Sequence, residues 1–298
     1  MKTHFTLESG GTIPSVGLGT WQLEEEDGHE AILYALKNGY RMIDAAYAYN
    51  NQKTVGLAIK ESCVPRDEIF IIDKLANTWH TAAEECLELT LKALGVDYLD
   101  CWLMHWPSPL NHKGNDKKTP KLADGSIDFE KEWTYVDTWR EMIRIQKKFS
   151  TKVRSIGVAN FGIKELENII TKTGVKPEIN QVELHPANNQ QNLFDYCKKM
   201  EIQLVAYSPL GSIGSPLLQS EELNDIAEKR GISVAQLILS WGVGSGWPVL
   251  PRSKSPERLS ANLTLVSLTS TEIAKITSIG LAHKQRFIQA PWHDFVEE

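Results

Sequence analysis

The stretches Tyr40-Arg-Met-Ile-Asp44, Ile69-Phe-Ile-Ile-Asp-Lys74 and Tyr98-Leu-Asp-Cys-Trp-Leu-Met-His105 are three short apolar runs, and each ends in a reactive side chain. Each run has the length and composition of a buried β-strand. Asp44 and Lys74 are 30 positions apart, and Lys74 and His105 are 31 apart, so each gap fits one strand and one helix. Because repeated strand–helix units bring the carboxyl ends of their strands to one face, we expect a carboxylate, an amine and an imidazole to meet there.

The same alternation of strands and helices continues along the chain. Strands are predicted at residues 16–19, 40–43, 69–72, 98–104, 153–158, 178–182, 202–206 and 248–250. Helices are predicted at residues 30–37, 52–61, 81–94, 135–147, 164–171, 193–200, 219–230, 233–241, 256–263 and 271–279. Eight alternating units predict an α/β fold of the (β/α)8 TIM-barrel type, formed by residues 1–298 as one domain.

Two segments fall outside this alternation. Residues 5–13 alternate around Gly10-Gly11 and predict an N-terminal β-hairpin. Residues 107–133 are rich in Pro, Asn, Lys, Gly and Asp, which indicates a long βα loop at the carboxyl face, either a functional lid or a disordered insert. An open doubly wound sheet is the alternative fold. Gly17-Leu-Gly19 argues against it, because the third glycine of a dinucleotide-binding motif is missing and no helix follows immediately.

The bulk composition excludes several classes of protein. The chain is 42% hydrophobic and 23% charged with a net charge of −6, and it has no long basic run, so we expect neither a nucleic-acid nor a membrane partner. It contains no long apolar span and no signal-peptide pattern, which predicts a cytoplasmic protein. Its four cysteines lack Cys-x-x-Cys spacing, so we predict free thiols and no metal site. A monomer is the default expectation.

The residues at the predicted strand ends suit one kind of chemistry, together with Tyr49 five positions after Asp44. A free phenol has a pKa near 10, and the Lys74 ammonium would lower the pKa of Tyr49. Asp44 would pair with Lys74, and a neutral His105 would orient a substrate oxygen. Each residue alone has a structural explanation, such as a turn, a cap or a core histidine. Their joint occurrence predicts a general acid that protonates a carbonyl oxygen. None of these side chains can supply the hydride that the reduction needs, so a nicotinamide cofactor is implied.

Eight motifs are spread in order over nearly the whole chain. They are Gly17-Leu-Gly-Thr-Trp21, Tyr40-Arg-Met-Ile-Asp-Ala-Ala-Tyr-Ala-Tyr-Asn50, Lys74-Leu75, Leu103-Met-His-Trp-Pro107, Ile156-Gly-Val-Ala-Asn-Phe161, Asn180-Gln-Val-Glu-Leu-His-Pro186, Ala206-Tyr-Ser-Pro-Leu-Gly-Ser212 and Leu250-Pro-Arg-Ser-Lys-Ser-Pro-Glu-Arg258. Together they resemble the aldo-keto reductase superfamily. Residues 121–126 and 133–139 resemble its fungal NADP-dependent glycerol dehydrogenase and glyceraldehyde reductase branch.

The resemblance implies NADPH-dependent reduction of an aldehyde or ketone, with Tyr49 as general acid and Asp44, Lys74 and His105 as its partners. It implies cofactor contacts from Thr20, Asn160, Gln181, Tyr207, Ser208, Leu210, Ser212, Arg252, Ser253, Arg258 and Asn262. Among these, Asn160 and Gln181 would hold the nicotinamide amide and Tyr207 would stack on its ring. It also implies a substrate pocket lined by Trp21, Ala76, Trp106 and Trp292.

The cofactor's phosphate contacts also have an independent physical basis. Arg252 and Arg258 flank Ser253 around a predicted helix start, and guanidinium groups bind phosphate through paired hydrogen bonds. This arrangement favours NADPH over NADH.

Three positions depart from the pattern of the superfamily. Ala159 stands where a serine is common, Ala261 where a glutamate is common, and Ala76 where a bulky aromatic residue is usual. Because Ala76 would widen the pocket, we hypothesise a substrate bulkier than glyceraldehyde, such as a hydrophobic or secondary-metabolite ketone. Residues 286–292 resemble the tail that closes over the substrate.

Two other functions remain open at this point. A Schiff-base aldolase on the same barrel would use Lys74 as nucleophile, although the Arg252 and Arg258 site would then need a phosphorylated substrate. A non-catalytic cofactor sensor would bind NADPH without turnover.

Overall fold

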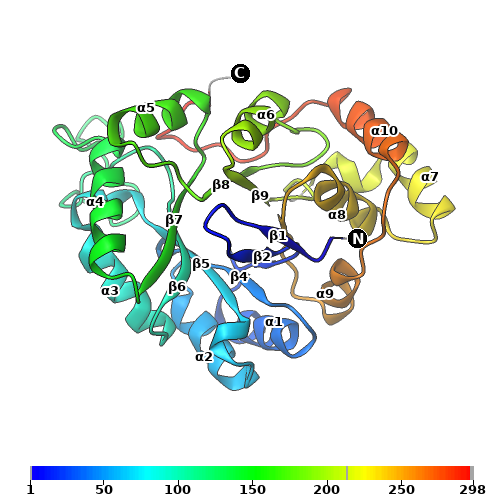
Figure 1. Ribbon diagram of the computed structural model, residues 1–298, viewed down its shortest axis with the longest axis horizontal. Helices are drawn as coiled ribbons and strands as arrows, with labels where there is room; N and C mark the ends of the chain where they lie inside the picture. The colour runs from blue at the N-terminus through cyan, green and yellow to red at the C-terminus, as the bar shows by residue number, and fades with distance from the viewer. Residues whose placement is uncertain (1, 213, 296–298) are drawn as a thin grey trace.

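The computed structural model describes residues 2–212 and 214–295, and its centre is an eight-stranded sheet in which every neighbouring pair of strands is parallel (Figure 1). The strands are β3 (Leu18–Gly19), β4 (Met42–Asp44), β5 (Phe70–Leu75), β6 (Leu99–Met104), β7 (Val153–Ala159), β8 (Ile179–Glu183), β9 (Gln203–Tyr207) and β10 (Val249–Leu250). Their order in space follows their order in the chain. This sequential parallel order is the arrangement expected for repeated strand–helix units.

Backbone hydrogen bonds join the first and last strands. Val16 and Val249 form a parallel bridge, and the amide of Gly17 donates to the carbonyl oxygen of Val249 at 2.9 Å. The amide of Val249 donates in turn to the carbonyl oxygen of Ser15 at 2.9 Å. The sheet is therefore a closed (β/α)8 barrel, as predicted, and not an open doubly wound sheet.

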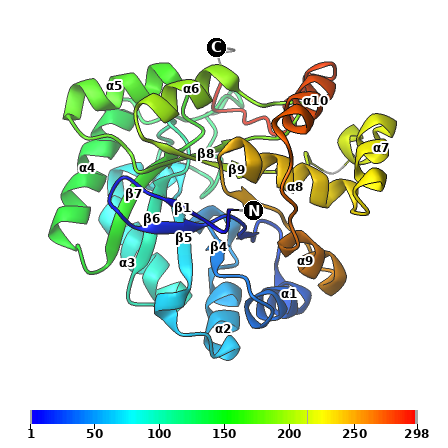
Figure 2. The same ribbon diagram turned by 45° about the vertical axis from the view of Figure 1, so that its right-hand side comes forward.

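Helices surround the barrel on its outer side, as the two views in Figures 1 and 2 show. They are α1 (Glu25–Lys37), α2 (Gln52–Ser62), α3 (Ala83–Leu94), α4 (Tyr135–Lys148), α5 (Ile163–Thr173), α6 (Gln191–Lys199), α7 (Glu221–Lys229), α8 (Val234–Ser245), α9 (Pro256–Leu263) and α10 (Ser270–Leu281). Their buried apolar faces join the strand residues in one hydrophobic core, which includes Trp102, Trp139 and Trp241. No helix in the described part of the chain is long and apolar enough to cross a membrane.

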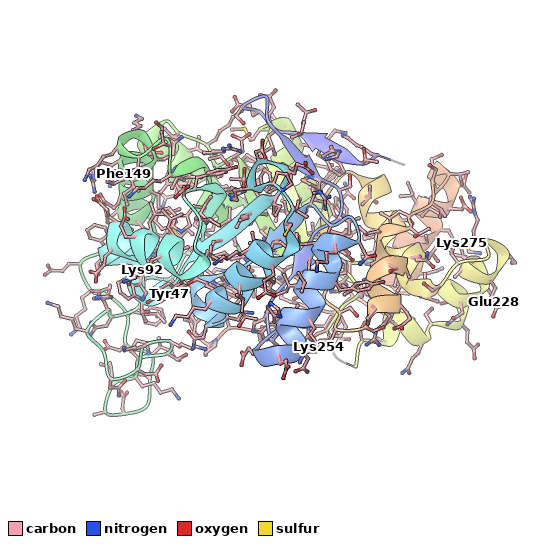
Figure 3. The ribbon with its side chains drawn as sticks, turned by 90° about the horizontal axis from the view of Figure 1, so that it is seen from below. Tyr47, Lys92, Phe149, Glu228, Lys254 and Lys275 are labelled. Carbon is pink, nitrogen blue, oxygen red and sulfur yellow. The ribbon has the colours of Figure 1, made fainter. Side chains whose placement is uncertain are left out.

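The two segments outside the alternation lie at opposite ends of the barrel (Figure 3). The predicted hairpin is present as β1 (His4–Thr6) and β2 (Thr12–Pro14), with Phe5 paired to Ile13 and both side chains buried. The loop 107–133 is folded, because Leu110 and Phe129 form an antiparallel bridge, as do Lys121 and Ile127. With the hairpin at one end, the other end of the barrel is left for the site.

Some local elements differ from the predictions. Helix α1 begins at Glu25 and not at residue 30. The prediction missed this start because the first turn is acidic and has no apolar periodicity. The helix predicted at 219–230 is split into η4 (Pro216–Gln219) and α7 at Ser220, whose hydroxyl caps α7 by accepting from the amide of Leu223. The sequence also gave no indication of the 3-10 helix η1 (Tyr47–Tyr49) that carries Tyr49.

Candidate active site

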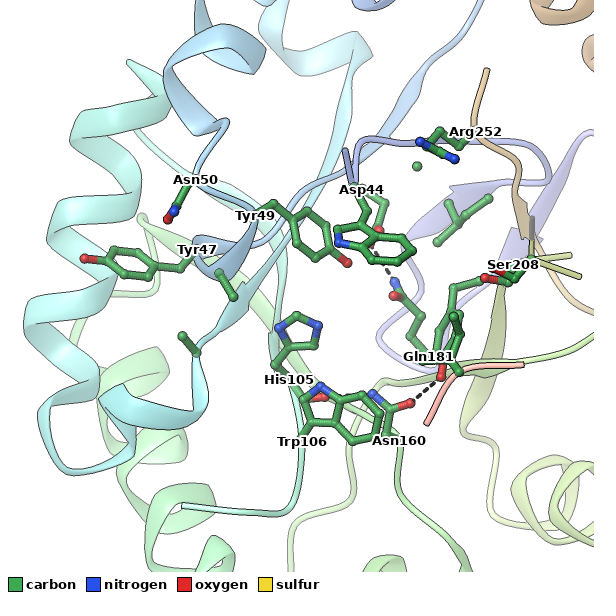
Figure 4. A pocket seen from close by; sticks show the side chains of 18 of the residues that line it. Asp44, Tyr47, Tyr49, Asn50, His105, Trp106, Asn160, Gln181, Ser208 and Arg252 are labelled. Carbon is green, nitrogen blue, oxygen red and sulfur yellow. Dashed lines mark hydrogen bonds between the residues drawn. The ribbon is translucent and has the colours of Figure 1, made fainter. Parts of the chain in front are cut away.

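The three residues predicted at strand ends, Asp44, Lys74 and His105, meet Tyr49 on one face of the barrel. Figure 4 shows Asp44, Tyr49 and His105 there. Asp44 ends β4, Lys74 lies in β5, His105 directly follows β6, and Tyr49 projects from η1. The Lys74 Nζ atom donates to Asp44 Oδ1 at 2.7 Å, to the Ala45 carbonyl oxygen at 2.9 Å and to the Tyr49 hydroxyl at 3.3 Å. The ammonium therefore links the carboxylate to the phenol, as the spacing predicted.

The pKa of Tyr49 differs from the predicted one. Burial raises the pKa of Tyr49 to about 12, although the nearby Lys74 charge acts in the expected, lowering direction. Asp44 adds a smaller raising effect because its negative charge opposes a phenolate. The expectation of a depressed pKa weighed the ammonium and left out the loss of water around the ring. Tyr49 is consequently a phenol that stays protonated at neutral pH.

Lys74 remains charged in the buried site. Burial by itself lowers the pKa of an ammonium group, but the Asp44 and Tyr49 partners outweigh it, so the pKa of Lys74 is raised.

Asp73, one position before Lys74, was not among the predicted site residues. Burial raises the pKa of Asp73 to about 7, while the hydrogen bond from Gln52 and the Lys74 charge oppose this shift.

His105 is a neutral imidazole. Burial lowers the pKa of His105 well below its usual value, and the charge of Lys74 acts in the same direction. Its ring centroid lies 5.7 Å from that of Tyr49, and its Nδ1 atom has no hydrogen-bond partner among the described residues. A neutral ring beside the phenol is suited to orienting a substrate oxygen through a hydrogen bond.

Three residues predicted to contact the cofactor form a linked group beside the catalytic residues. Gln181 Nε2 donates to Asp44 Oδ1 at 2.6 Å, and the Tyr207 hydroxyl donates to Asn160 Oδ1 at 2.7 Å (dashed in Figure 4). Asn160 Nδ2 donates to the His105 carbonyl oxygen at 3.0 Å. Each amide oxygen has a second lone pair and each amide nitrogen a second hydrogen, so the group retains capacity to bind a carboxamide.

A cavity of about 1520 Å³ extends over these residues. Its described wall contains all the predicted cofactor residues except Thr20, namely Asn160, Gln181, Tyr207, Ser208, Leu210, Ser212, Arg252, Ser253, Arg258 and Asn262. Thr20 is fully buried instead, and its hydroxyl donates to the Asp44 carbonyl oxygen at 2.8 Å. Lys74 lies behind the wall, so its ammonium acts through Tyr49.

One end of the cavity is cationic. Arg252 and Arg258 line this end together with Ser253, and Arg258 Nε donates to Ser253 Oγ at 3.3 Å. Ser255 caps the following helix α9 by accepting from the amide of Arg258 at 3.3 Å. The structure thus brings the two guanidinium groups to one end of the cavity beside the start of α9, and their role in binding an anion stays a prediction.

The four predicted substrate residues all line the cavity near Tyr49: Trp21, Ala76, Trp106 and Trp292. The rings of Trp106 and Trp292 are packed edge to face at 6.1 Å. Ala76 does not stand alone in its part of the wall, because Tyr47, Ala48 and Trp79 also line it. Tyr47 points away from the Tyr49 hydroxyl in Figure 4, and its ring packs against Trp79 at 5.2 Å.

The tail after α10 is held by a residue that sequence reasoning missed. Glu183, fully buried at the end of β8, accepts from the backbone amides of Phe287 at 2.7 Å and Ile288 at 2.8 Å. It also contacts His185 Nε2 at 2.9 Å. Because Ile288 and Trp292 line the cavity, Glu183 fixes this part of its wall. The available signal was its place at a strand end, like Asp44.

Comparisons with known proteins agree with this geometry. The Aldo/keto reductase family model matches residues 15–280. The chain is 40% identical to a glycerol 2-dehydrogenase (NADP(+)) of Saccharomyces cerevisiae, over 97% of this chain and 95% of the relative. It is 41% identical to a D-galacturonate reductase of Hypocrea jecorina, over 98% and 96%. The solved aldose reductase of Schistosoma japonicum superposes with a TM-score of 0.89 at 30% identity, covering 97% of this chain and 94% of that one. This chain therefore belongs to the aldo/keto reductase family.

Proposed function

We propose that this oxidoreductase of carbonyl and CH–OH groups reduces an aldehyde or ketone with NADPH and uses Tyr49 as its general acid. The observation that carries the proposal is the position of Lys74 Nζ, 2.7 Å from Asp44 Oδ1 and 3.3 Å from the Tyr49 hydroxyl. This buried chain of charges ends at a phenol that faces the cavity.

The residues present fit a nicotinamide dinucleotide phosphate. Asn160 and Gln181 would hold the carboxamide with their spare hydrogen-bonding capacity, and Tyr207 would stack on the ring. Ser208, Leu210 and Ser212 would line the pyrophosphate, while Arg252, Ser253 and Arg258 would bind the 2′-phosphate. The cavity, at about 1520 Å³, exceeds the ~300–1,000 Å³ of an ordinary ligand pocket, so it has room for a second molecule.

The proton comes from Tyr49 in this proposal. When bound, the nicotinamide supplies the hydride for the carbonyl carbon. His105 orients the carbonyl oxygen, and the Tyr49 hydroxyl gives its proton to that oxygen as negative charge develops there. Lys74, held in its charged form by Asp44, stabilises the phenolate that remains. A pKa of about 12 keeps Tyr49 protonated and ready to donate across the physiological pH range.

The charged state of Lys74 argues against the aldolase alternative. A Schiff base needs a neutral amine, whereas the Lys74 ammonium has a raised pKa and donates to three oxygen atoms. Borohydride trapping with carbonyl compounds checks this point, and an adduct on Lys74 would revive the aldolase. A cofactor sensor is distinguished by turnover: tight NADPH binding without NADPH oxidation by any aldehyde, sugar or ketone would support it.

Replacing Tyr49 by phenylalanine tests the mechanism. Tyr49→Phe removes the proton donor and leaves the ring, so we expect kcat for carbonyl reduction to fall by ~10²–10⁴-fold. NADPH binding, followed by quenching of tryptophan fluorescence, should change little. Tyr98→Phe is the matched control, because the Tyr98 hydroxyl bonds the Arg66 carbonyl oxygen far from the cavity. Reduction by Tyr49→Phe at the wild-type rate would refute the assignment.

We also propose that residues 1–298 work as one monomeric catalytic domain in the cytoplasm. None of the four cysteines forms a disulfide in the described structure, as is usual in a reducing compartment. Met1, Ile213 and residues 296–298 lie outside the described residues. Sedimentation of the purified enzyme with NADPH checks the monomer.

A further inference from the structure

The cavity has a second cationic end, away from Arg252 and Arg258, which the proposed cofactor does not need. Four lysines line it: Lys53 of α2, Lys92 of α3, and Lys117 and Lys118 of the loop 107–133. We call these four residues the lysine end. In Figure 3, Lys92 and Tyr47 lie on the side of the barrel from which this loop projects.

The charge of the cavity wall is opposite to that of the whole chain. The chain has 38 acidic and 32 basic residues and a net charge of −6. The described wall, however, holds the four lysines and two arginines against a single carboxylate, Asp44. Asp44 is already paired with Lys74. A cavity lined by charges of one sign attracts ligands of the other sign.

The four lysine side chains are exposed and take part in no ion pair of the described structure. Nearby basic residues on the outer surface form ion pairs, such as Lys148 with Glu84 and Lys152 with Glu88. None of the ion pairs among residues 2–212 and 214–295 includes a member of the lysine end.

Carboxylates outside the cavity wall also act in this region. Asp116 accepts from the backbone amide of Lys118 at 2.7 Å, and the charge of Lys118 helps to lower the pKa of Asp116. Glu85 is close enough to Tyr47 to contribute to its raised pKa, after burial and Cys86. Neither carboxylate belongs to the described cavity wall.

A continuous stretch of wall joins the lysine end to the catalytic residues. Ala76, Asn77 and Thr78 are consecutive lining residues, and the Thr78 hydroxyl donates to the Lys117 carbonyl oxygen at 2.8 Å. The rings of Tyr47 and Trp79 brace this stretch. Ala76 contributes only a methyl group to this stretch of the wall.

We propose that the lysine end binds an anionic group of the carbonyl substrate, a carboxylate or a phosphate at the end of the molecule opposite its carbonyl. The inference rests on the proposed carbonyl reduction and names its substrate class. Lysine ammonium groups act as mobile point charges, so the site selects negative charge and not one particular anion. This proposal names a polar, acidic substrate, whereas Ala76 by itself led to the hypothesis of a hydrophobic or secondary-metabolite ketone.

Matched pairs of aldehydes test the proposal with the full-length enzyme and NADPH. D-galacturonate is compared with D-galactose, and D-glyceraldehyde 3-phosphate with D-glyceraldehyde, at low ionic strength. Each lysine is expected to contribute about two- to fivefold. Together they should make kcat/KM about tenfold or more higher for the anionic aldehyde than for its uncharged partner in at least one pair. Raising the salt to 1 M, where the Debye length is ~3 Å, should remove most of this preference. The pair that shows the preference identifies carboxylate or phosphate.

Lysine substitutions locate the effect. Lys92→Ala and Lys117→Ala should each lower the ratio of kcat/KM for anion over uncharged partner about two- to fivefold. Lys113→Ala, on the same exposed loop but outside the described wall, should leave that ratio unchanged. If uncharged aldehydes are reduced and the anions have no advantage, the lysine-end proposal alone is wrong. If no aldehyde of either pair oxidises NADPH, the proposed function fails with it.

Discussion

Asp73 is a fully buried carboxyl group one position before Lys74, and burial raises its pKa to about 7. The unfolded chain releases this proton near pH 4, so between about pH 4 and pH 7 the folded state binds one proton more. The free energy of unfolding must therefore fall as the pH rises through this window. Ionised Asp73 therefore destabilises the folded state above neutral pH, and an asparagine of the same shape cannot ionise.

Asp73→Asn tests this linkage. Between pH 5 and pH 8 the free energy of unfolding of the wild type should fall by on the order of 3 kcal/mol relative to that of the variant, because one pKa unit corresponds to about 1.4 kcal/mol. Urea unfolding of both proteins at the two pH values gives the difference. Asp128→Asn, a carboxyl group bonded by Asn111 in the loop 107–133, serves as control. A difference between wild type and Asp73→Asn that is the same at both pH values would contradict the raised pKa.

Ala76 lines the cavity between the Tyr49 region and the lysine end, and we expect the size of its side chain to set the room for a substrate there. Ala76→Trp would fill it with an indole, and overpacking of such a space costs ~1–3 kcal/mol. We expect kcat/KM for a long or bulky carbonyl substrate to fall about tenfold or more relative to that for a small aldehyde. NADPH oxidation with benzaldehyde-sized and glyceraldehyde-sized substrates measures the ratio. Equal losses with both sizes would mean that Ala76 does not set the room for a substrate.

Single residues were predictable where a strand end placed them. Asp44, Lys74 and His105 follow apolar runs at a regular spacing, so their meeting could be derived. The lysine end could not, because α2, α3 and a loop contribute its members without periodicity. The raised pKa of Tyr49 was also beyond the sequence, since it depends on how much water the folded wall excludes.

At the scale of elements, the contact between β8 and the tail depends on one carboxylate. Glu183→Gln exchanges an acceptor oxygen for a carboxamide NH2 group, which donates and cannot accept, so one of the backbone amides of Phe287 and Ile288 loses its partner, at a cost of ~1–3 kcal/mol. We expect faster hydrogen exchange at these two amides and a several-fold higher KM for the carbonyl substrate, with a smaller change in kcat.

Glu178→Gln is the matched control for this prediction. Glu178 also accepts from a backbone amide, that of Ser9 at 3.0 Å, but it does so at the hairpin end of the barrel. Glu178→Gln should leave both the hydrogen exchange of the amides of residues 287 and 288 and the KM for the carbonyl substrate unchanged. Equal effects of the two substitutions would show general destabilisation and not a specific anchor for the tail.

Elements were predictable where an apolar period was strong. The predicted strands agree with the observed ones within about three residues, and the long loop was found from its composition. The first turn of α1 and the helix η1 were missed because neither has an apolar period of its own. Tertiary contacts and the tight turn after β4 decide their conformation.

At the scale of the whole molecule, cofactor binding should be visible as stability. A ligand that binds only the folded state stabilises it by ~2.7 kcal/mol at one hundred times its Kd. We expect NADPH to raise Tm by several degrees and NADH by less at the same concentration, because only NADPH carries the 2′-phosphate. Arg258→Ala should remove most of this difference. Differential scanning fluorimetry measures it, with Arg140→Ala on α4 as control; equal shifts by both cofactors would contradict the phosphate site.

The closed barrel itself was the most predictable property of the chain. Eight strand–helix units of similar length are compatible with few parallel arrangements. Only the backbone contacts near Val16 and Val249 that close the barrel were not predictable from the sequence. The cavity was less predictable, since loops and the tail supply much of its wall.

The anchoring of the tail has a consequence for how this enzyme can change. Glu183 holds Phe287 and Ile288 through their main-chain amides, which every residue except proline possesses. Substitutions at positions 287 and 288 that keep a main-chain N–H can therefore preserve these two hydrogen bonds, while the ring contact of Trp292 with Trp106 depends on its side chain. Because Ile288, Gln289, Ala290 and Trp292 line the cavity, a substitution library at residues 288–292 would change its wall while the catalytic residues and the two anchoring hydrogen bonds stay in place.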